Sequence, residues 1–163
     1  PSPIPHPGLS MSSIRPFLWY ATEAEDAANF YVSIIPNSRV VNVMRGGPGG
    51  PVIAVDFELD GRPFAALNGR QGPGFTEATS FAVTCETQAE VDRYWNALTS
   101  GGGEEGQCGW LKDRWGVSWQ VVPAVLSKLL GDPDPAKAGR VMQAMLPMRR
   151  LDIAALERAH AGA

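Results

Sequence analysis

The sixteen residues CGWLKDRWGVSWQVVP, Cys108 to Pro123, gather much of the chemistry that this chain offers. They hold three of its five tryptophans, a Lys-Asp-Arg cluster and the amide of Gln120. Alternation along a strand would place Ser118 and Gln120 on one face and Trp119 on the other. An apolar wall with a few hydrogen-bonding groups is typical of a small-molecule site. We therefore expect one wall of a ligand pocket here.

Other residues of suitable type join this wall through the same alternation, which groups Ser80 with Thr84 and Asn68 with Ala66 and Phe64. The candidate ligand-binding residues are Trp19, Asn68, Ser80, Thr84, Trp110, Arg114, Ser118 and Gln120. For the tryptophans, burial in the core is the competing interpretation. No catalytic residue is assigned.

The cluster Lys112-Asp113-Arg114 separates two strand-like runs, so we expect an exposed turn with weak ion pairs. The alternative is that Lys112 or Arg114 binds an anionic ligand at the mouth of the pocket.

Covalent catalysis by cysteine is not favoured, because neither Cys85 nor Cys108 has a histidine near it in the sequence. The histidines are His6, near the start, and His160, near the end. The two cysteines form no CxxC pair and lie in apolar surroundings, so two reduced core thiols in a cytoplasmic protein are expected.

The elements that must position these groups occur twice. Thr22-Glu23-Ala24-Glu25 and Thr87-Gln88-Ala89-Glu90 both match the capping box at the start of a helix. Each follows a short apolar run and precedes strand-like segments, with Asp60-Gly61 as a hairpin signal in the first set. The pattern predicts an α+β fold of two βαβββ modules, over about residues 14–70 and 78–123, that form a cleft. A generic α+β sandwich without a cleft is the alternative.

The chain is expected to have three parts. Residues 1–13 are rich in proline and predict a disordered tail or an expression remnant, and residues 14–130 form the paired βαβββ domain. Residues 131–163 predict a helical extension: Asp134-Pro135 and Asp152 begin helices, and Val141, Met142, Met145 and Met148 form an apolar stripe. That stripe is expected to pack on the protein's own core or on a partner subunit.

Composition limits the classes of partner that the protein is expected to bind. A net charge of −3 and a pI near 5.4 provide no basic field for nucleic acid. No apolar run approaches the roughly 18 residues of a membrane span, and residues 1–13 lack the pattern of a signal peptide. We expect a cytoplasmic protein that binds neither nucleic acid nor membrane.

With both halves in view, the chain resembles the vicinal oxygen chelate superfamily, with its glyoxalase/bleomycin-resistance fold, and within it the PhnB-like branch often named 3-demethylubiquinone 3-methyltransferase. The resemblance is carried by RPFLWYATEAEDAANFYVSIIPNSRV, FAALNG, SFAVTCETQAEVDRYWNAL, CGWLKDRWGVSWQVVP and RVMQAMLPMRRLDIAALERA. It implies paired modules around a U-shaped cleft, commonly within a homodimer.

Enzymes of that superfamily use a divalent ion held by His, Glu or Gln on the first and fourth strands of each module. The corresponding positions here are Phe17 or Trp19, Leu67 or Asn68, Ser80, and Gln120. One neutral amide beside a serine and an asparagine is a poor set of ligands for a divalent ion. We therefore expect neither a metal nor another cofactor in the cleft. Gly46 to Gly50 joins two strands, so it predicts a hairpin loop and no nucleoside-cofactor turn.

The resulting hypothesis is a homodimer that binds a small metabolite in a metal-free cleft. One alternative is a metal-independent enzyme, either a lyase or isomerase or the methyltransferase of the family name. Another is a resistance protein that sequesters a drug.

Overall fold

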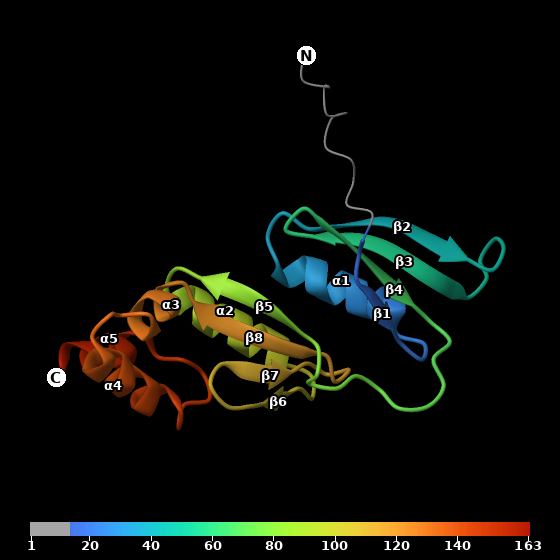
Figure 1. Cartoon of the computed structure of the whole chain (residues 1–163). Helices are drawn as coiled ribbons and strands as arrows, with labels where there is room; N and C mark the ends of the chain where they lie inside the picture. The colour runs from blue at the N-terminus through green and yellow to red at the C-terminus, as the bar shows by residue number, and fades with distance from the viewer. Residues whose placement is uncertain (1–13) are drawn as a thin grey trace, which may run out of the picture. The chain divides into compact units, whose positions relative to one another are not determined.

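The computed structural model describes residues 14–163, which divide into two compact units at Pro73 and Gly74 (Figure 1). The tail predicted for residues 1–13 lies outside the described residues. Each unit is described by itself.

The first unit is a βαβββ module. It comprises β1 (Phe17–Trp19), α1 (Ala24–Ile34), β2 (Arg39–Arg45), β3 (Val52–Leu59) and β4 (Arg62–Leu67). The strand order is β1-β4-β3-β2, with β1 parallel to β4 and the other pairs antiparallel. The helix α1 packs on one face of this sheet, where Tyr31 stacks on Phe57 and Phe57 on Phe64.

The second unit repeats the topology and adds helices. It comprises β5 (Ser80–Cys85), α2 (Gln88–Thr99), β6 (Glu104–Glu105), β7 (Trp110–Lys112), β8 (Ser118–Pro123), α3 (Val125–Leu130), α4 (Pro135–Met145) and α5 (Ile153–Ala161). The order β5-β8-β7-β6 matches that of the first sheet strand for strand, with β5 parallel to β8. The predicted duplication of βαβββ modules and the helical C-terminal segment are therefore confirmed.

Local sequence signals account for several of the element ends. The Thr87 hydroxyl accepts from the Glu90 N–H at 3.2 Å, and the Glu90 carboxylate accepts from the Glu86 N–H at 2.9 Å, so this capping box forms nearly as predicted. Asp60 and Gly61 both take positive φ, of 49° and 72°, in the hairpin between β3 and β4.

The prediction of a capping box at Thr22–Glu25 was wrong. The helix α1 begins after Glu23, whose side chain makes no capping bond to it. Instead the Ala24 N–H donates at 2.9 Å to Oδ1 of Asn68, at the end of β4. A residue distant in the sequence thus accepts a hydrogen bond from a free N–H group at the start of α1, the role that Thr22 was expected to fill.

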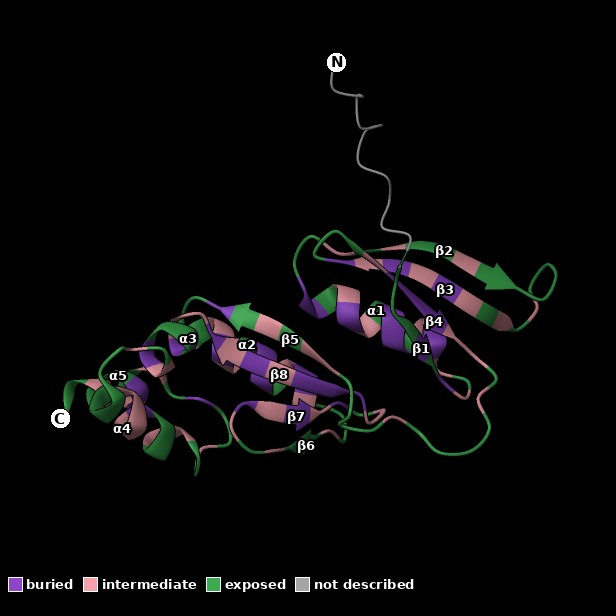
Figure 2. Cartoon of the chain, in the orientation of Figure 1, coloured by how far each residue is buried: buried purple, intermediate pink, exposed green. Residues whose placement is uncertain are grey.

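The C-terminal helices have a core of their own. Leu126, Leu129, Val141, Leu151 and Leu156 are buried together, and Met145 and Met148 pack against them. Part of the predicted methionine stripe therefore packs on the chain itself, whereas Met142 is 41% exposed. In the sheet of the second unit, the central strand β8 is largely buried and the edge strand β6 is exposed, as Figure 2 shows. Among residues 14–163, no helix has the length and apolar content needed to cross a membrane.

Candidate functional site

The sheet of the second unit has two chemically different faces. Residues that pair directly across strands share a face, and alternate residues lie on opposite faces. Trp119, Val121 and Leu111 therefore share the face that packs on α2, where they are buried. The opposite face, called here the open face, carries Ser80, Ala82, Trp110, Lys112, Ser118 and Gln120.

On the open face the polar side chains form rows across the strands. Lys112 pairs with Ser118, which pairs with Ser80. In the next row Trp110 pairs with Gln120. The register thus brings together groups that are up to 40 residues apart in the chain.

Two of the predicted site residues bond to each other. The Gln120 Nε2 donates to the Ser80 Oγ at 2.9 Å, and both side chains are partly buried. Since a serine hydroxyl can also donate, and the Gln120 carbonyl can accept, this pair keeps hydrogen-bonding capacity for a ligand.

Ser118 is exceptional among the described residues. It is 2% exposed, and its hydroxyl is the buried side-chain polar atom of residues 14–163 that has no hydrogen-bond partner. A buried hydroxyl without a partner is costly, and such groups in native proteins call for an explanation.

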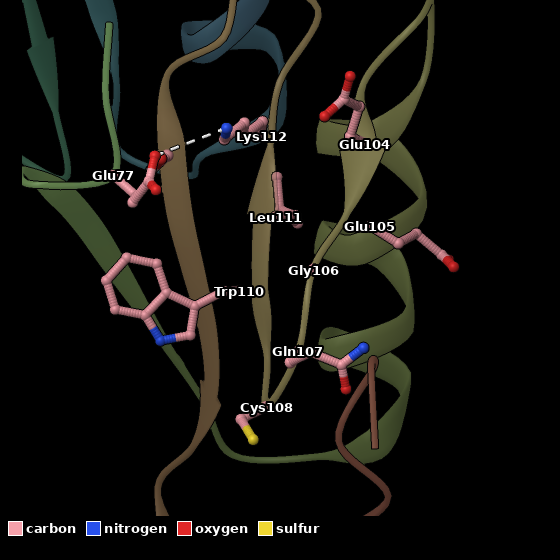
Figure 3. A pocket seen from close by; sticks show the side chains of 10 residues that line it. Glu77, Glu104, Glu105, Gly106, Gln107, Cys108, Trp110, Leu111 and Lys112 are labelled. Carbon is pink, nitrogen blue, oxygen red and sulfur yellow. Dashed lines mark ion pairs between the residues drawn. The ribbon is translucent and has the colours of Figure 1, made fainter. Parts of the chain in front are cut away.

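A cavity of about 550 Å³ lies beside Ser118, along β6 and β7 (Figure 3). Its lining comprises Glu77, Glu104, Glu105, Gly106, Gln107, Cys108, Trp110, Leu111, Lys112 and Ser118. In Figure 3 Trp110 and Lys112 project to the same side of β7, and the Lys112 Nζ lies 3.6 Å from a Glu77 carboxylate oxygen. This size suits a small organic ligand.

Sequence reasoning missed several of these lining residues. Cys108 and Gln107 belong to a loop, and Glu77 precedes β5 in a segment without periodicity, so alternation could not place them. Lys112 was considered only as an alternative anion-binding residue; it follows Trp110 at a spacing of two, and alternation places it on the same face.

The expectation of an exposed Lys-Asp-Arg turn was wrong for Asp113, which is 2% exposed. Its Oδ1 accepts from the Trp115 and Val117 N–H groups at 3.0 Å, and its Oδ2 accepts from the Trp119 indole at 3.0 Å. Asp113 therefore organises the turn between β7 and β8. Arg114 is exposed, donates to the Ser100 hydroxyl at 3.1 Å, and lies over the Trp115 ring.

The candidates Thr84 and Trp19 lie outside the lining of the cavity. Thr84 is exposed on the open face, beyond Ala82. Trp19 belongs to the first unit, is 47% exposed, and donates from its indole to the Asn68 carbonyl at 3.3 Å.

The placing of Asn68 in a ligand wall stays a prediction; Phe64 of the same parity stacks on Phe57 on the helix side of the first sheet. Both halves of the Asn68 amide have protein partners, the Ala24 N–H and the Val52 carbonyl. Asn68 thus lies where it secures the start of α1.

The two cysteines differ. Cys85 is fully buried, and burial, aided by Glu90, raises the pKa of its thiol to about 11. Cys108 is only partly buried, lines the cavity, and directs its thiol toward the Met145 and Leu146 carbonyls. The expectation that Cys108 is a core thiol was therefore wrong. Both are free.

The residues present do not fit a divalent ion of the kind that superfamily enzymes use. Within residues 14–163, no three His, Cys, Asp or Glu side chains gather closely enough to hold one. The Gln120 amide is bonded to Ser80, a neutral partner.

The described chain also lacks the glycine-rich strand-to-helix turn that binds a nucleoside cofactor in Rossmann-type folds. The turn from β1 to α1 is Tyr-Ala-Thr-Glu, at 20–23, and that from β5 to α2 is Glu86-Thr87. The glycine-rich segment at 46–50 joins β2 to β3, the hairpin position that was predicted.

Comparisons with known proteins agree with this architecture. A family model described as 3-demethylubiquinone-9 3-methyltransferase matches residues 12–122. A PhnB protein from Bacillus cereus is 35% identical, with a TM-score of 0.64, over 69% of this chain and 100% of that one. No curated protein matches.

Two more distant structures share the fold alone. Protein PA1353 from Pseudomonas aeruginosa is 19% identical, with a TM-score of 0.57, over 68% of this chain and 96% of that one. The fosfomycin resistance protein FosX from Mesorhizobium loti is 12% identical, with a TM-score of 0.56, over 76% of this chain and 99% of that one. With two βαβββ modules and a family model spanning both, the chain belongs to the PhnB-like 3-demethylubiquinone-9 3-methyltransferase family, and its fold is consistent with the vicinal oxygen chelate superfamily.

Proposed function

We propose that this protein binds a small organic metabolite on the open face of its second sheet, without a bound metal ion. The observation that carries the proposal is the buried Ser118 hydroxyl, which has no hydrogen-bond partner within residues 14–163 and belongs to a residue in the lining of a cavity of about 550 Å³. A ligand oxygen or nitrogen in that cavity would satisfy it. Gln120 and Ser80 lie outside the lining, but they pair across the strands with Trp110 and Ser118 and would offer hydrogen-bonding groups to a ligand that extends over the open face.

The metal-free part of the proposal rests on the chemistry of the side chains. Ser80, Ser118 and Gln120 are neutral, whereas divalent ions in proteins are held mainly by carboxylates, imidazoles or thiolates. Native mass spectrometry with elemental analysis, before and after addition of Ni, Mn or Zn, tests it. We expect no uptake; one ion bound per protomer would contradict the proposal and favour oxygen-chelate chemistry.

The ligand-binding part is tested with the variant Gln120→Ala. Screening a panel of small polar and aromatic metabolites by NMR should identify compounds that shift the Trp110 indole signal. Removing the Gln120 amide should weaken such binding about tenfold while the fold persists, because one hydrogen-bonding group is lost. An unfolded variant would instead mean that Gln120 is a structural amide. Ser127→Ala, an exposed serine on α3, is the matched control.

A methyltransferase is the second candidate, and the family description is what favours it. The two activities separate in one experiment, calorimetric titration with S-adenosylmethionine. We expect no binding, because the described strand-to-helix turns lack glycine. Micromolar binding would make methyl transfer the leading function.

We further propose a cytoplasmic homodimer. The open side of the first sheet exposes large apolar side chains: Phe17 is 55% exposed, Trp19 47% and Met44 51%. Apolar groups gathered on a surface often mark an interface. Two free cysteines are consistent with a reducing compartment.

A further inference from the structure

We propose that the cavity beside Ser118 selects a neutral, planar aromatic molecule that carries an oxygen substituent, and that Ser118 determines this specificity. The inference rests on the proposed function and narrows it to a chemical class. It uses three features of the cavity: an aromatic surface, a buried hydroxyl, and charges that already have partners.

Trp110 supplies the aromatic surface. Trp95 and Trp119 are buried at 1% and 2% exposure, and each donates from its indole to a carboxylate. Trp110 is only partly buried and lines the cavity from β7. Across the strands it pairs with Gln120, which pairs with Ala82. A flat ligand ring in the cavity could therefore stack on the Trp110 indole.

Ser118 supplies the specific hydrogen bond. Its position lies one row away from Trp110, next to Lys112 and Ser80. A ring beside Trp110 would therefore direct a substituent along the strands toward the Ser118 hydroxyl. Because that hydroxyl is buried and unbonded within residues 14–163, an oxygen substituent gains a bond there and a hydrocarbon gains none.

The charged groups around the cavity favour a neutral ligand. Lys112 lies 3.6 Å from Glu77, and Glu105 accepts from Trp95 at 2.7 Å and lies 3.8 Å from Arg149. Glu104 pairs with Lys112 across the strands and adds a further carboxylate to the lining, so an anion would be repelled. A cation would have to leave water for a site whose buried group is a neutral hydroxyl, which is costly.

The test compares three probes of the same size: benzamide, which is neutral, benzoate, an anion, and benzamidine, a cation. Each is titrated into the full chain while the Trp110 indole and Ser118 amide signals are followed by NMR. We expect benzamide to bind about tenfold more tightly than either charged probe, the usual scale of one good hydrogen bond. Cyclohexanecarboxamide, which is not planar, should bind more weakly than benzamide.

Variants assign the effect to the residues. Ser118→Ala should remove most of the benzamide preference, whereas the exposed Ser127→Ala should leave it unchanged. Ser118→Thr, which restores a hydroxyl, should recover part of it. If Ser118→Ala fails to fold, the preference of the unmodified chain among the four probes still decides the question.

The possible failures are distinct. Tighter binding of benzamidine would show that the rim carboxylates select a cation, and tighter binding of benzoate that Lys112 leaves Glu77 for an anion; either result overturns the inference. If no benzene derivative binds but another metabolite shifts Trp110, the chemical class is wrong and the proposed function stands. If nothing shifts Trp110, both fail.

Discussion

At the scale of single residues, Asp113 and Ser118 illustrate opposite uses of a buried polar group. Asp113 accepts three hydrogen bonds, from two backbone N–H groups and the Trp119 indole, and so serves the structure of the turn. Ser118, five residues later in the chain, is equally buried and accepts none within residues 14–163. A buried polar group whose hydrogen bonds are made within the protein therefore has a structural role, whereas one without such bonds is a candidate for binding a ligand.

Replacing Asp113 should destabilise the second unit without a ligand being involved. In Asp113→Ala three donors lose their acceptor, two of them in buried hydrogen bonds, and we expect the free energy of unfolding to fall by about 3 kcal/mol. Urea denaturation followed by tryptophan fluorescence measures this. Asp26→Ala, an exposed position on α1, is the control and should change stability by less than about 0.5 kcal/mol. A loss as small as that of the control would mean that the turn forms without Asp113.

At the scale of elements, the C-terminal helices are an addition to the matched family region, which ends at residue 122. The connection between α4 and α5 holds the loop that lines the cavity: the Met148 carbonyl accepts from the Cys108 N–H, and the Arg149 carbonyl from the Gly109 N–H, both at 2.8 Å. Gln88 of α2 adds a bond to the Leu151 carbonyl. We propose that residues 131–163 act as an extension that stabilises this wall of the cavity.

Leu151 is the apolar anchor of that extension, with 0% exposure. Leu151→Ala should lower the free energy of unfolding by about 2–5 kcal/mol, because it leaves a cavity in a packed cluster. Leu146→Ala, at a position that is 56% exposed, is the matched control and should have little effect. Thermal and urea unfolding of the two variants compares them. Equal stability would show that the extension is only loosely held.

The extension should also respond to acid through Asp132. The Asp134 N–H, and then His160 at 2.8 Å, hold the pKa of the Asp132 carboxyl below its ordinary value. The folded state then binds the proton less readily than the unfolded state, so the stabilisation is complete above the unfolded pKa and is lost as pH falls through the folded pKa.

Asp132→Asn should therefore flatten the loss of stability in acid, below about pH 4. Urea midpoints measured between neutral and acidic pH, for the unmodified chain and for Asp132→Asn, test this. An unchanged acid limb in Asp132→Asn would remove Asp132 as its cause.

At the scale of the whole molecule, the proposed homodimer is the main prediction to test. Trp19→Lys places a charge among the exposed apolar side chains of the first sheet. If the proposed homodimer forms there, this variant should be a monomer, as measured by native mass spectrometry and light scattering. Met142→Lys, on the exposed side of α4, should leave the dimer intact. The reverse result would assign the interface to the methionine stripe of the extension.

Strand alternation, turn residues and the repeated order of elements were enough to predict the duplicated βαβββ modules and most of the open face. These signals are local, because side chains alternate along a strand and Asp-Gly turns reverse it whatever the rest of the chain does. Ser80, Ser118 and Gln120 were placed on one face in this way, and the structure agrees.

Only the tertiary structure decided which polar groups the protein itself satisfies. Asn68 bonds to the start of α1, Asp113 bonds to Trp119, and Glu77 meets Lys112 across a stretch with no regular pattern. Such partners are chosen by the strand register and loop geometry, which bring distant residues together. A sequence can therefore indicate which residues share a face. That the Ser118 hydroxyl has no partner among residues 14–163 is evident only once its neighbouring groups have been placed.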